Sequence, residues 1–402
     1  MVSGLLMELE DHNCWTIAEA LGHRGPHRLQ HLLSRAAWDD QEMIDLAADW
    51  AAEHLDDGEA VLIVDETADA KSSTDAAGAA RQYSGTLGGI ELCQVAVTLT
   101  YATGRGHALI GRALYLPQAS AADDEHRELA GIPGEVMFAT KPELADELLG
   151  RAHQRGIRAA FAAGDEVYGG RGLRRAIRGR GMGYVLAIRS NTAITPGSGK
   201  PVTAAGAAGL IPARGWQRMR TGSGTKGARH YDWAMLEITA DDTPDGQDDA
   251  GHSVLLIRRH RYTRTLSYYR CWTPASVPLP RLIAVAQTRW RIEEDHQLSK
   301  QVAGLDSGQV TRWRSWHRWS AICLLAYIYL AVATATDQAA STSPELIPLT
   351  VPELLRLLRG PVIPQPRRDP AHRHRWSDWR RHHQYQACQA HQRWNAYADA
   401  TS

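Results

Sequence analysis

The stretch AVLIVD, residues 60–65, decides the fold that we expect for this chain. Its apolar, largely β-branched residues predict a buried strand, and Asp65 follows directly. A carboxylate at the end of a buried strand is costly unless its charge has a partner, and a divalent cation shared by several carboxylates is a common solution. Asp165 in the sequence GDEVYG and Glu293 in the sequence RWRIE suit the same role. We therefore expect the fold to gather Asp65, Asp165 and Glu293 around a catalytic metal.

The order of the elements around these acids predicts how the fold gathers them. In chain order we expect strands at 61–64, 95–100 and 108–116, a helix at 142–153, a strand at 157–163, a helix at 173–178 and a strand at 184–189. This order matches the ribonuclease H-like arrangement, in which the first and fourth strands lie side by side. That adjacency would bring Asp65 and Asp165 within metal-bridging distance.

Changes in composition divide the chain into segments, as a length of 402 residues leads us to expect. The segments are a helical, candidate DNA-binding region at 1–58, the first part of the catalytic core at 59–189, a β-rich insertion at 190–280, the second part of the core at 281–336, and a linker with a basic Arg/His/Trp-rich tail at 337–402. A structural cap is an equally good interpretation of the first segment. The fold class that we expect is α/β, with a ribonuclease H-like mixed sheet core, a β-rich insertion and an N-terminal helical domain.

Overall composition excludes several classes of protein. The formal net charge of zero argues against a polycation that coats nucleic acid, although the tail suits phosphates and stacked bases. The five cysteines are scattered and indicate neither a zinc site nor disulfides, which is typical of a reducing cytoplasm. No apolar leader is visible at the N-terminus. Residues 320–336 approach membrane-spanning length, but their small and polar residues favour a buried core helix.

One helix motif is more specific than these patterns. Arg289, three residues, Glu293, six residues and Lys300 together resemble the signature helix of bacterial insertion-sequence transposases of the DDE type. Blocks from VDET, which contains Asp65, to AGLD after Lys300 resemble that family in the same order. The resemblance implies a ribonuclease H-like core with a β insertion, and Asp65, Asp165 and Glu293 as catalytic residues and metal ligands. The implied cofactor is a pair of Mg²⁺ ions, with Mn²⁺ as a substitute.

Basic residues near these acids are candidates for DNA contact. Arg289 and Lys300 fall on the helix face of Glu293, and we assign both to DNA phosphate. Salt bridges on a solvated face are the alternative. Lys226 and Arg229 in the insertion are expected to touch the DNA backbone, with a solvated loop as an equally good interpretation. Glu294 and Asp295 adjoin Glu293, but neighbouring helical residues point about 100° apart, so only one of the three can face the site squarely.

The function predicted from the sequence is a transposase that binds double-stranded DNA at inverted repeats, hydrolyses one strand and transfers the freed end to target DNA. We expect it in the cytoplasm with the nucleoid, as a homodimer on DNA, with no membrane partner. Glycine-rich residues 197–200 and 222–227 do not lie between a strand and a helix, so no nucleotide cofactor is expected.

Two alternatives remain open. One is a catalytically inactive DNA-binding remnant or regulator, because the chain begins inside what resembles the family's N-terminal helical region, and Ala286 replaces a tyrosine of the wider group. The other is a hydrolase that acts on sugars with two carboxylates. The spacing of Arg289 and Lys300 argues against the second alternative.

Overall fold

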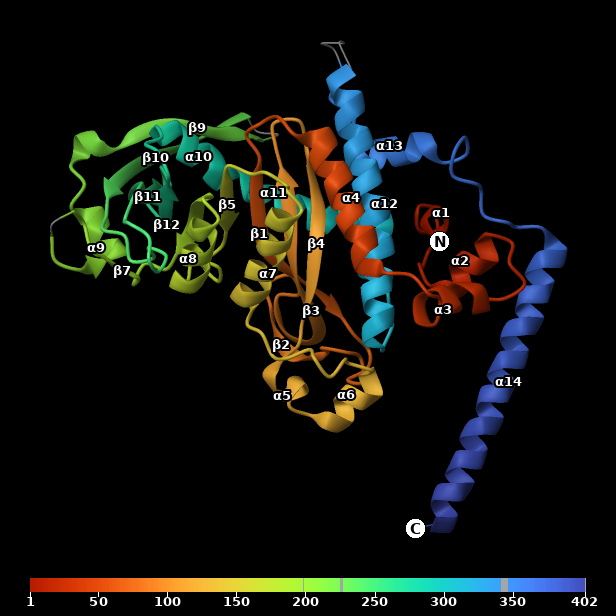
Figure 1. The fold of residues 1–402 in the computed structure, drawn as a ribbon. Helices are drawn as coiled ribbons and strands as arrows, with labels where there is room; N and C mark the ends of the chain where they lie inside the picture. The colour runs from red at the N-terminus through yellow and green to blue at the C-terminus, as the bar shows by residue number, and fades with distance from the viewer. Residues whose placement is uncertain (198, 225–226, 341–345, 402) are drawn as a thin grey trace.

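A computed structural model describes residues 1–197, 199–224, 227–340 and 346–401. Its strands are β1 (Val61–Ala70), β2 (Ala80–Ser84), β3 (Gly89–Ala102), β4 (His107–Tyr115), β5 (Phe161–Gly164), β6 (Gly183–Ile188), β7 (Ala193–Ile194), β8 (Val202–Thr203), β9 (Gln217–Gly224), β10 (Gly227–Glu237), β11 (His252–Arg259) and β12 (Leu266–Thr273). Strands β7 and β8 form a small sheet of their own, and the others join in one large sheet (Figure 1).

The first half of the large sheet has the ribonuclease H-like order. Strand β1 pairs antiparallel with β3, and β3 pairs antiparallel with β4. On its other side β1 pairs parallel with β5, which in turn pairs parallel with β6. The predicted meander and the predicted adjacency of the first and fourth core strands are both confirmed. The short strand β2, which pairs with β3, was not predicted from the sequence.

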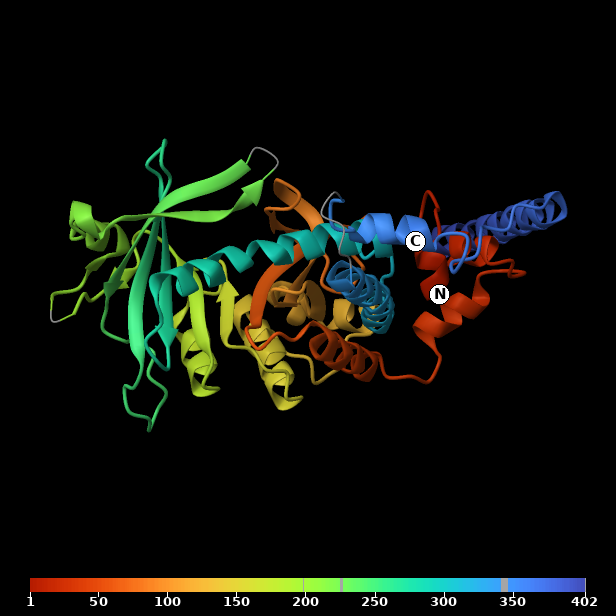
Figure 2. The ribbon, with the colours of Figure 1, turned by 90° about the horizontal axis from the view of Figure 1, so that it is seen from above.

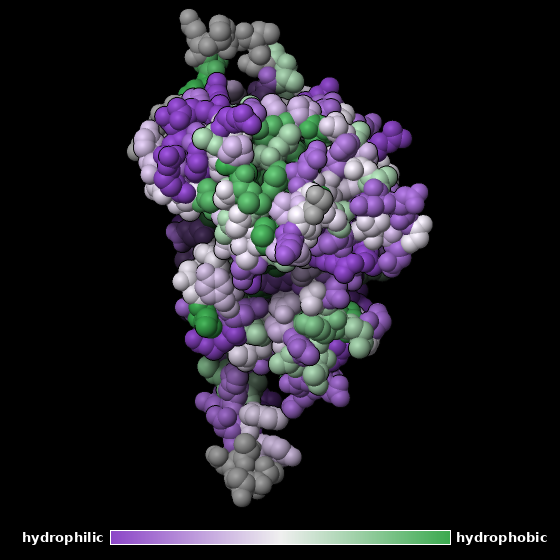
Figure 3. Space-filling view, turned by 90° about the vertical axis from the view of Figure 1, so that its left-hand side faces the viewer, coloured by the Kyte–Doolittle hydropathy of each residue, from purple (hydrophilic) through white to green (hydrophobic). Residues whose placement is uncertain are grey.

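The strands of residues 190–280 continue the core sheet. Strand β12 pairs antiparallel with β6, and β11, β10 and β9 follow in that order. An unpaired β6 would leave a row of backbone donors and acceptors open, and β12 satisfies them. Figure 3 shows the end of the molecule that these strands form, where a central group of hydrophobic side chains lies among hydrophilic ones.

Helices cover both faces of the sheet (Figure 2). They are α1 (Val2–Leu5), α2 (Cys14–Ala20), α3 (His27–Ser34), α4 (Asp40–Leu55), α5 (Gln118–Ala121), α6 (Asp124–Ala130), α7 (Lys141–Gln154), α8 (Arg171–Gly179), α9 (Ala204–Gly209), α10 (Leu279–Thr288), α11 (Trp290–Ala303), α12 (Trp313–Ala340), α13 (Val351–Leu358) and α14 (Pro370–Thr401). Helices α7 and α8 contact one face, whereas α10 and α11 contact the other.

The long apolar helix α12 is a core helix, as predicted. It packs against α1, α3, α4 and β4. By length and composition it could cross a membrane, but 72% of its most apolar window is buried inside the protein. Burial of this kind is typical of the central helix of a globular core.

The basic tail forms helix α14, which begins by packing on the N-terminal helices. Trp376 is buried and its indole N–H donates to the carbonyl of His23 at 2.9 Å. His372 Nε2 lies 2.8 Å from the carbonyl oxygen of Glu19. Beyond these contacts the helix departs from the body of the molecule (Figure 1). Part of the aromatic character that suggested base stacking therefore serves internal packing.

Candidate active site

The register of two parallel strands brings Asp65 and Asp165 together. Val64 of β1 pairs with Gly164 of β5, so the residues that follow them lie at the same edge of the sheet. Gly164 permits this approach, because a Cβ there would meet Val64 Cγ2 at 3.0 Å. Each carboxylate accepts a backbone N–H: Asp65 Oδ1 from Glu66 and Asp165 Oδ1 from Val167, both at 2.8 Å.

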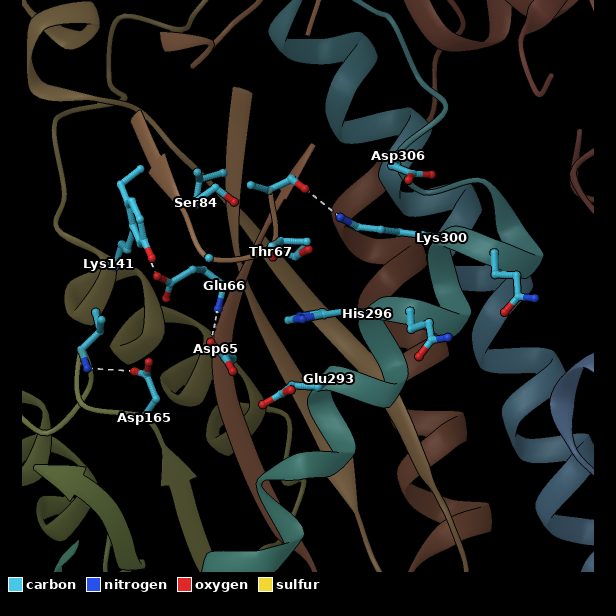
Figure 4. A pocket seen from close by; sticks show the side chains of 18 of the residues that line it. Asp65, Glu66, Thr67, Ser84, Lys141, Asp165, Glu293, His296, Lys300 and Asp306 are labelled. Carbon is cyan, nitrogen blue, oxygen red and sulfur yellow. Dashed lines mark hydrogen bonds and ion pairs between the residues drawn. The ribbon is translucent and has the colours of Figure 1, made fainter. Parts of the chain in front are cut away.

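Glu293 lines the same cleft as Asp65 and Asp165, and it comes from helix α11, on the face of the sheet opposite to α7 and α8 (Figure 2). It lies in the first turn of α11, which runs over β1, β3 and β4. The helix ends at Gly304, whose φ of 63° is the left-handed conformation common at helix C-termini. Asp65, Asp165 and Glu293 all line one cleft of about 1120 Å³ (Figure 4). The structure thus brings the three predicted acids to one cavity.

Arg289 lies between two of the three acids. Its Nη1 is 3.1 Å from Asp65 Oδ2, and its Nη2 is 2.6 Å from Glu293 Oε1. The guanidinium is therefore held by carboxylates in this arrangement, which is the salt-bridge alternative rather than a free phosphate-binding group. It supplies positive charge beside Asp65 and Glu293.

Burial and like charge perturb the two aspartates. Burial, together with the charge of Asp165, raises the pKa of Asp65 to about 7 even though Arg289 opposes the change. The pKa of Asp165 is also raised, mainly by burial, while its hydrogen bond from Val167 acts in the opposite direction. A positive charge nearby would stabilise the ionised form of both carboxylates.

The three acids fit Mg²⁺ by the chemistry of their side chains, although these side chains do not form a close group. Their oxygen ligands are those that a hard divalent cation prefers. Among the described residues, however, no three His, Cys, Asp or Glu side chains are grouped closely enough to hold a metal ion. Arg289 forms ion pairs with both Asp65 and Glu293. A bound cation would compete with these two ion pairs for the carboxylate oxygens.

The other predicted DNA-contact residues have different settings. Lys300 lines the cleft, where its Nζ donates to the Ala68 carbonyl at 2.7 Å and pairs with Asp69 at 2.8 Å. Arg229 is exposed on β10 and is not among the residues that line the cleft. Lys226 lies outside the described residues.

The two acids that follow Glu293 point away from the cleft. Glu294 pairs with His107 at 3.3 Å and with Arg291 at 2.8 Å. Asp295 is completely buried. The divergence expected for neighbouring helical residues is therefore observed.

Several residues that line the cleft were not predicted from the sequence. Glu66 accepts the Lys141 ammonium at 2.7 Å and the Tyr168 hydroxyl at 2.6 Å, which ties α7 and the loop after β5 to β1. His296 lies 2.8 Å from Thr98 Oγ1, and burial lowers its pKa to about 4. The three-residue spacing from Glu293 could have identified His296, because such residues share a helix face. Lys141 offered no comparable signal.

Comparisons with known proteins show which proteins this chain is similar to. A family model described as "DDE superfamily endonuclease" matches residues 1–251, which include Asp65 and Asp165 but not Glu293. A "Probable transposase for insertion sequence element IS701" from Microchaete diplosiphon is 27% identical over 192 residues, which are 47% of this chain and 47% of that protein. The match therefore spans about half the length of this relative.

A solved structure offers a weaker likeness. It is a cryo-EM structure of the piggyBac transposase synaptic complex with hairpin DNA. Its TM-score is 0.45 at 11% sequence identity, and the match covers 89% of this chain and 68% of that one.

Proposed function

The chain belongs to the DDE superfamily endonuclease family, and we propose that it is the DNA transposase of an insertion sequence. In this proposal it binds the inverted repeats at the ends of the element, hydrolyses a phosphodiester bond there and transfers the freed 3′ hydroxyl to target DNA. A homodimer would hold the two ends together. The partial likeness to the IS701 transposase supports the choice of an insertion sequence as substrate.

One observation carries the proposal. Asp65 and Asp165 directly follow two residues that pair between the parallel strands β1 and β5. Glu293 reaches the same cleft from α11. These acids come from distant parts of the chain, and burial, together with the charge of Asp165, raises the pKa of Asp65. An ionised carboxylate in this buried setting destabilises the fold, and a catalytic metal site would explain why it is there.

Asp65, Asp165 and Glu293 are the residues that would hold Mg²⁺. Two bound ions would activate the attacking water and neutralise charge on the leaving oxygen. Arg289 forms ion pairs with Asp65 and Glu293. A guanidinium has five N–H donors, so Arg289 would also have donors for a DNA phosphate.

Basic side chains around the cleft would orient the DNA strand. Lys141 and Arg189 line it from the side of Asp165, and Lys300 lines it from α11. Contacts of ammonium and guanidinium groups with phosphates fix the register of a strand without reading its bases. Recognition of the inverted repeats would then fall to other surfaces, for which the N-terminal helices and the insertion are candidates.

The alternative is a DNA-binding protein without catalysis. The ion pairs of Arg289 favour it, because this guanidinium offsets part of the negative charge of Asp65 and Glu293. The two candidate functions share DNA binding and differ in cleavage, so only a cleavage assay separates them.

The test uses DNA ends taken from the genomic flanks of the gene. The purified protein is expected to nick this DNA with Mg²⁺ or Mn²⁺ and to stop when a chelator is added. Asp65→Ala, Asp165→Ala and Glu293→Ala should each abolish nicking but retain binding to the ends in a gel-shift assay. Binding without nicking by the wild-type protein would support the alternative, and nicking by any of the three variants would remove that residue from the site.

A further inference from the structure

Asp295 is a completely buried carboxylate on the helix that carries Glu293. Three donors from three different elements converge on it. The Thr100 hydroxyl of β3 donates to Oδ2 at 2.6 Å, and His107 Nδ1 of β4 lies 2.6 Å from Oδ1. The Tyr327 hydroxyl of α12 also donates to Oδ1. Among the described residues, no other acid of α11 is bonded to three different elements of the protein.

A buried charge in this position needs a reason. Removing a carboxylate from water is costly, and an apolar side chain would fill a core position at least as well for stability alone. The advantage of a carboxylate is direction, because its hydrogen bonds are satisfied in one orientation only. The apolar contacts of the same helix, through Ile292 and Val302, lack that selectivity.

The direction fixed by Asp295 determines where Glu293 points. Helical positions two residues apart differ by about 200° around the axis, so Asp295 faces the core when Glu293 faces the cleft. His107 strengthens the same orientation, because its second nitrogen lies 3.3 Å from Glu294. A rotation of α11 that kept its apolar contacts would break these bonds and turn Glu293 away from Asp65.

We propose that Asp295 is a positioning residue that fixes the rotation of helix α11 through Thr100, His107 and Tyr327, and thereby sets the approach of Glu293 to Asp65. The proposal rests on the proposed function, since it assigns Asp295 a role in that same site. It concerns no contact between Asp295 and DNA or metal.

The test replaces Asp295 or its donors and follows α11 itself. Asp295→Asn keeps the shape but offers one acceptor oxygen where three donors arrive. Thr100→Val and Tyr327→Phe each remove one hydrogen bond, which keeps the test available if Asp295→Asn fails to fold. Thr334→Val is the matched control, because the Thr334 hydroxyl is buried on α12 and, among the described residues, donates to the Leu330 carbonyl of its own helix.

Hydrogen exchange measures the anchoring without reference to activity. In Asp295→Asn, amides of residues 290–303 are expected to exchange roughly tenfold faster. Loss of a hydrogen bond to a charged group shifts the local opening equilibrium by about this factor. The smaller variants should show the same change to a lesser degree, and Thr334→Val should show none. Unchanged exchange in α11, or faster exchange spread over the whole protein, would overturn the proposal.

Nicking kinetics then connect the anchor to the site. Misplacement of a catalytic group by about 1 Å can cost roughly 100-fold in rate, so kcat should fall by about that factor in Asp295→Asn while KM for DNA stays within about twofold. A rise in KM with unchanged kcat would overturn the role assigned to Asp295. If the wild-type protein does not nick DNA at all, the proposed function fails, whereas the exchange measurement still decides whether Asp295 anchors α11.

Discussion

Replacing Asp65 by asparagine is expected to stabilise the metal-free protein, although it removes a group that we propose to be essential for cleavage. Asparagine has nearly the shape of aspartate and carries no charge. It therefore resembles the protonated form of Asp65, which burial and the neighbouring Asp165 favour in the folded state. The variant separates the cost of the site from its function.

The magnitude follows from the pKa. The folded protein raises the pKa of Asp65 from 3.8 to about 7. Each tenfold change corresponds to about 1.4 kcal/mol, so the ionised side chain costs the fold about 4 kcal/mol once the pH is above about 7. With an unfolding entropy of about 2.1 cal/mol/K per residue, a 402-residue chain should gain roughly 5 °C in Tm from the substitution.

The sign of the pH dependence gives the assay its control. Between the unfolded pKa of 3.8 and the folded pKa of about 7, the native state binds more protons than the unfolded chain. Stability of the wild-type protein from this group therefore falls as the pH rises through that window. Tm values of wild type and Asp65→Asn, measured in chelator, should converge near the acidic end of the window and separate at its alkaline end. A variant less stable than wild type at about pH 8, or a difference independent of pH, would refute the reasoning.

Further changes have outcomes that the same contacts predict. Mg²⁺ at about 100 times its Kd should stabilise the wild-type protein by about 2.7 kcal/mol, as judged by urea unfolding, and leave Asp65→Asn unchanged; equal stabilisation of both would place the ion elsewhere. Arg289→Ala removes the cation held by Asp65 and Glu293, so the pKa of Asp65 should rise further, a change that NMR titration of the carboxyl carbon would detect. Trp376→Ala should cost about 3–5 kcal/mol in denaturant unfolding and release the start of α14 to proteolysis, because the side chain is buried against the N-terminal helices. An unaltered proteolytic pattern would show that α14 is held by other contacts.

Local sequence patterns were sufficient to predict the core of the fold. The apolar run before Asp65 and the element order that follows led to the pairing of β1 with β5, because few topologies satisfy right-handed, short connections. The position of Glu293 depended on a motif, and helical geometry separated it from Glu294 and Asp295.

Local sequence patterns did not predict the contacts between distant segments of the chain. The pairing of β12 with β6 depends on which sheet edge is left open, and the sequence of the insertion does not specify it. The hydrogen bonds of Asp295 involve β3, β4 and α12, whose relative placement is fixed only in the folded protein. Arg289 was assigned to phosphate because its spacing matched a motif, whereas the nearest charges available to it are Asp65 and Glu293.

The most direct measurement is the anomalous scattering of Mn²⁺ in crystals of the protein. We predict peaks in the cleft, at coordination distance from carboxylate oxygens of Asp65, Asp165 and Glu293. Manganese bound only at other places, or a carboxylate of the three that stays outside the coordination sphere at saturating Mn²⁺, would contradict the claim that these acids share catalytic cations.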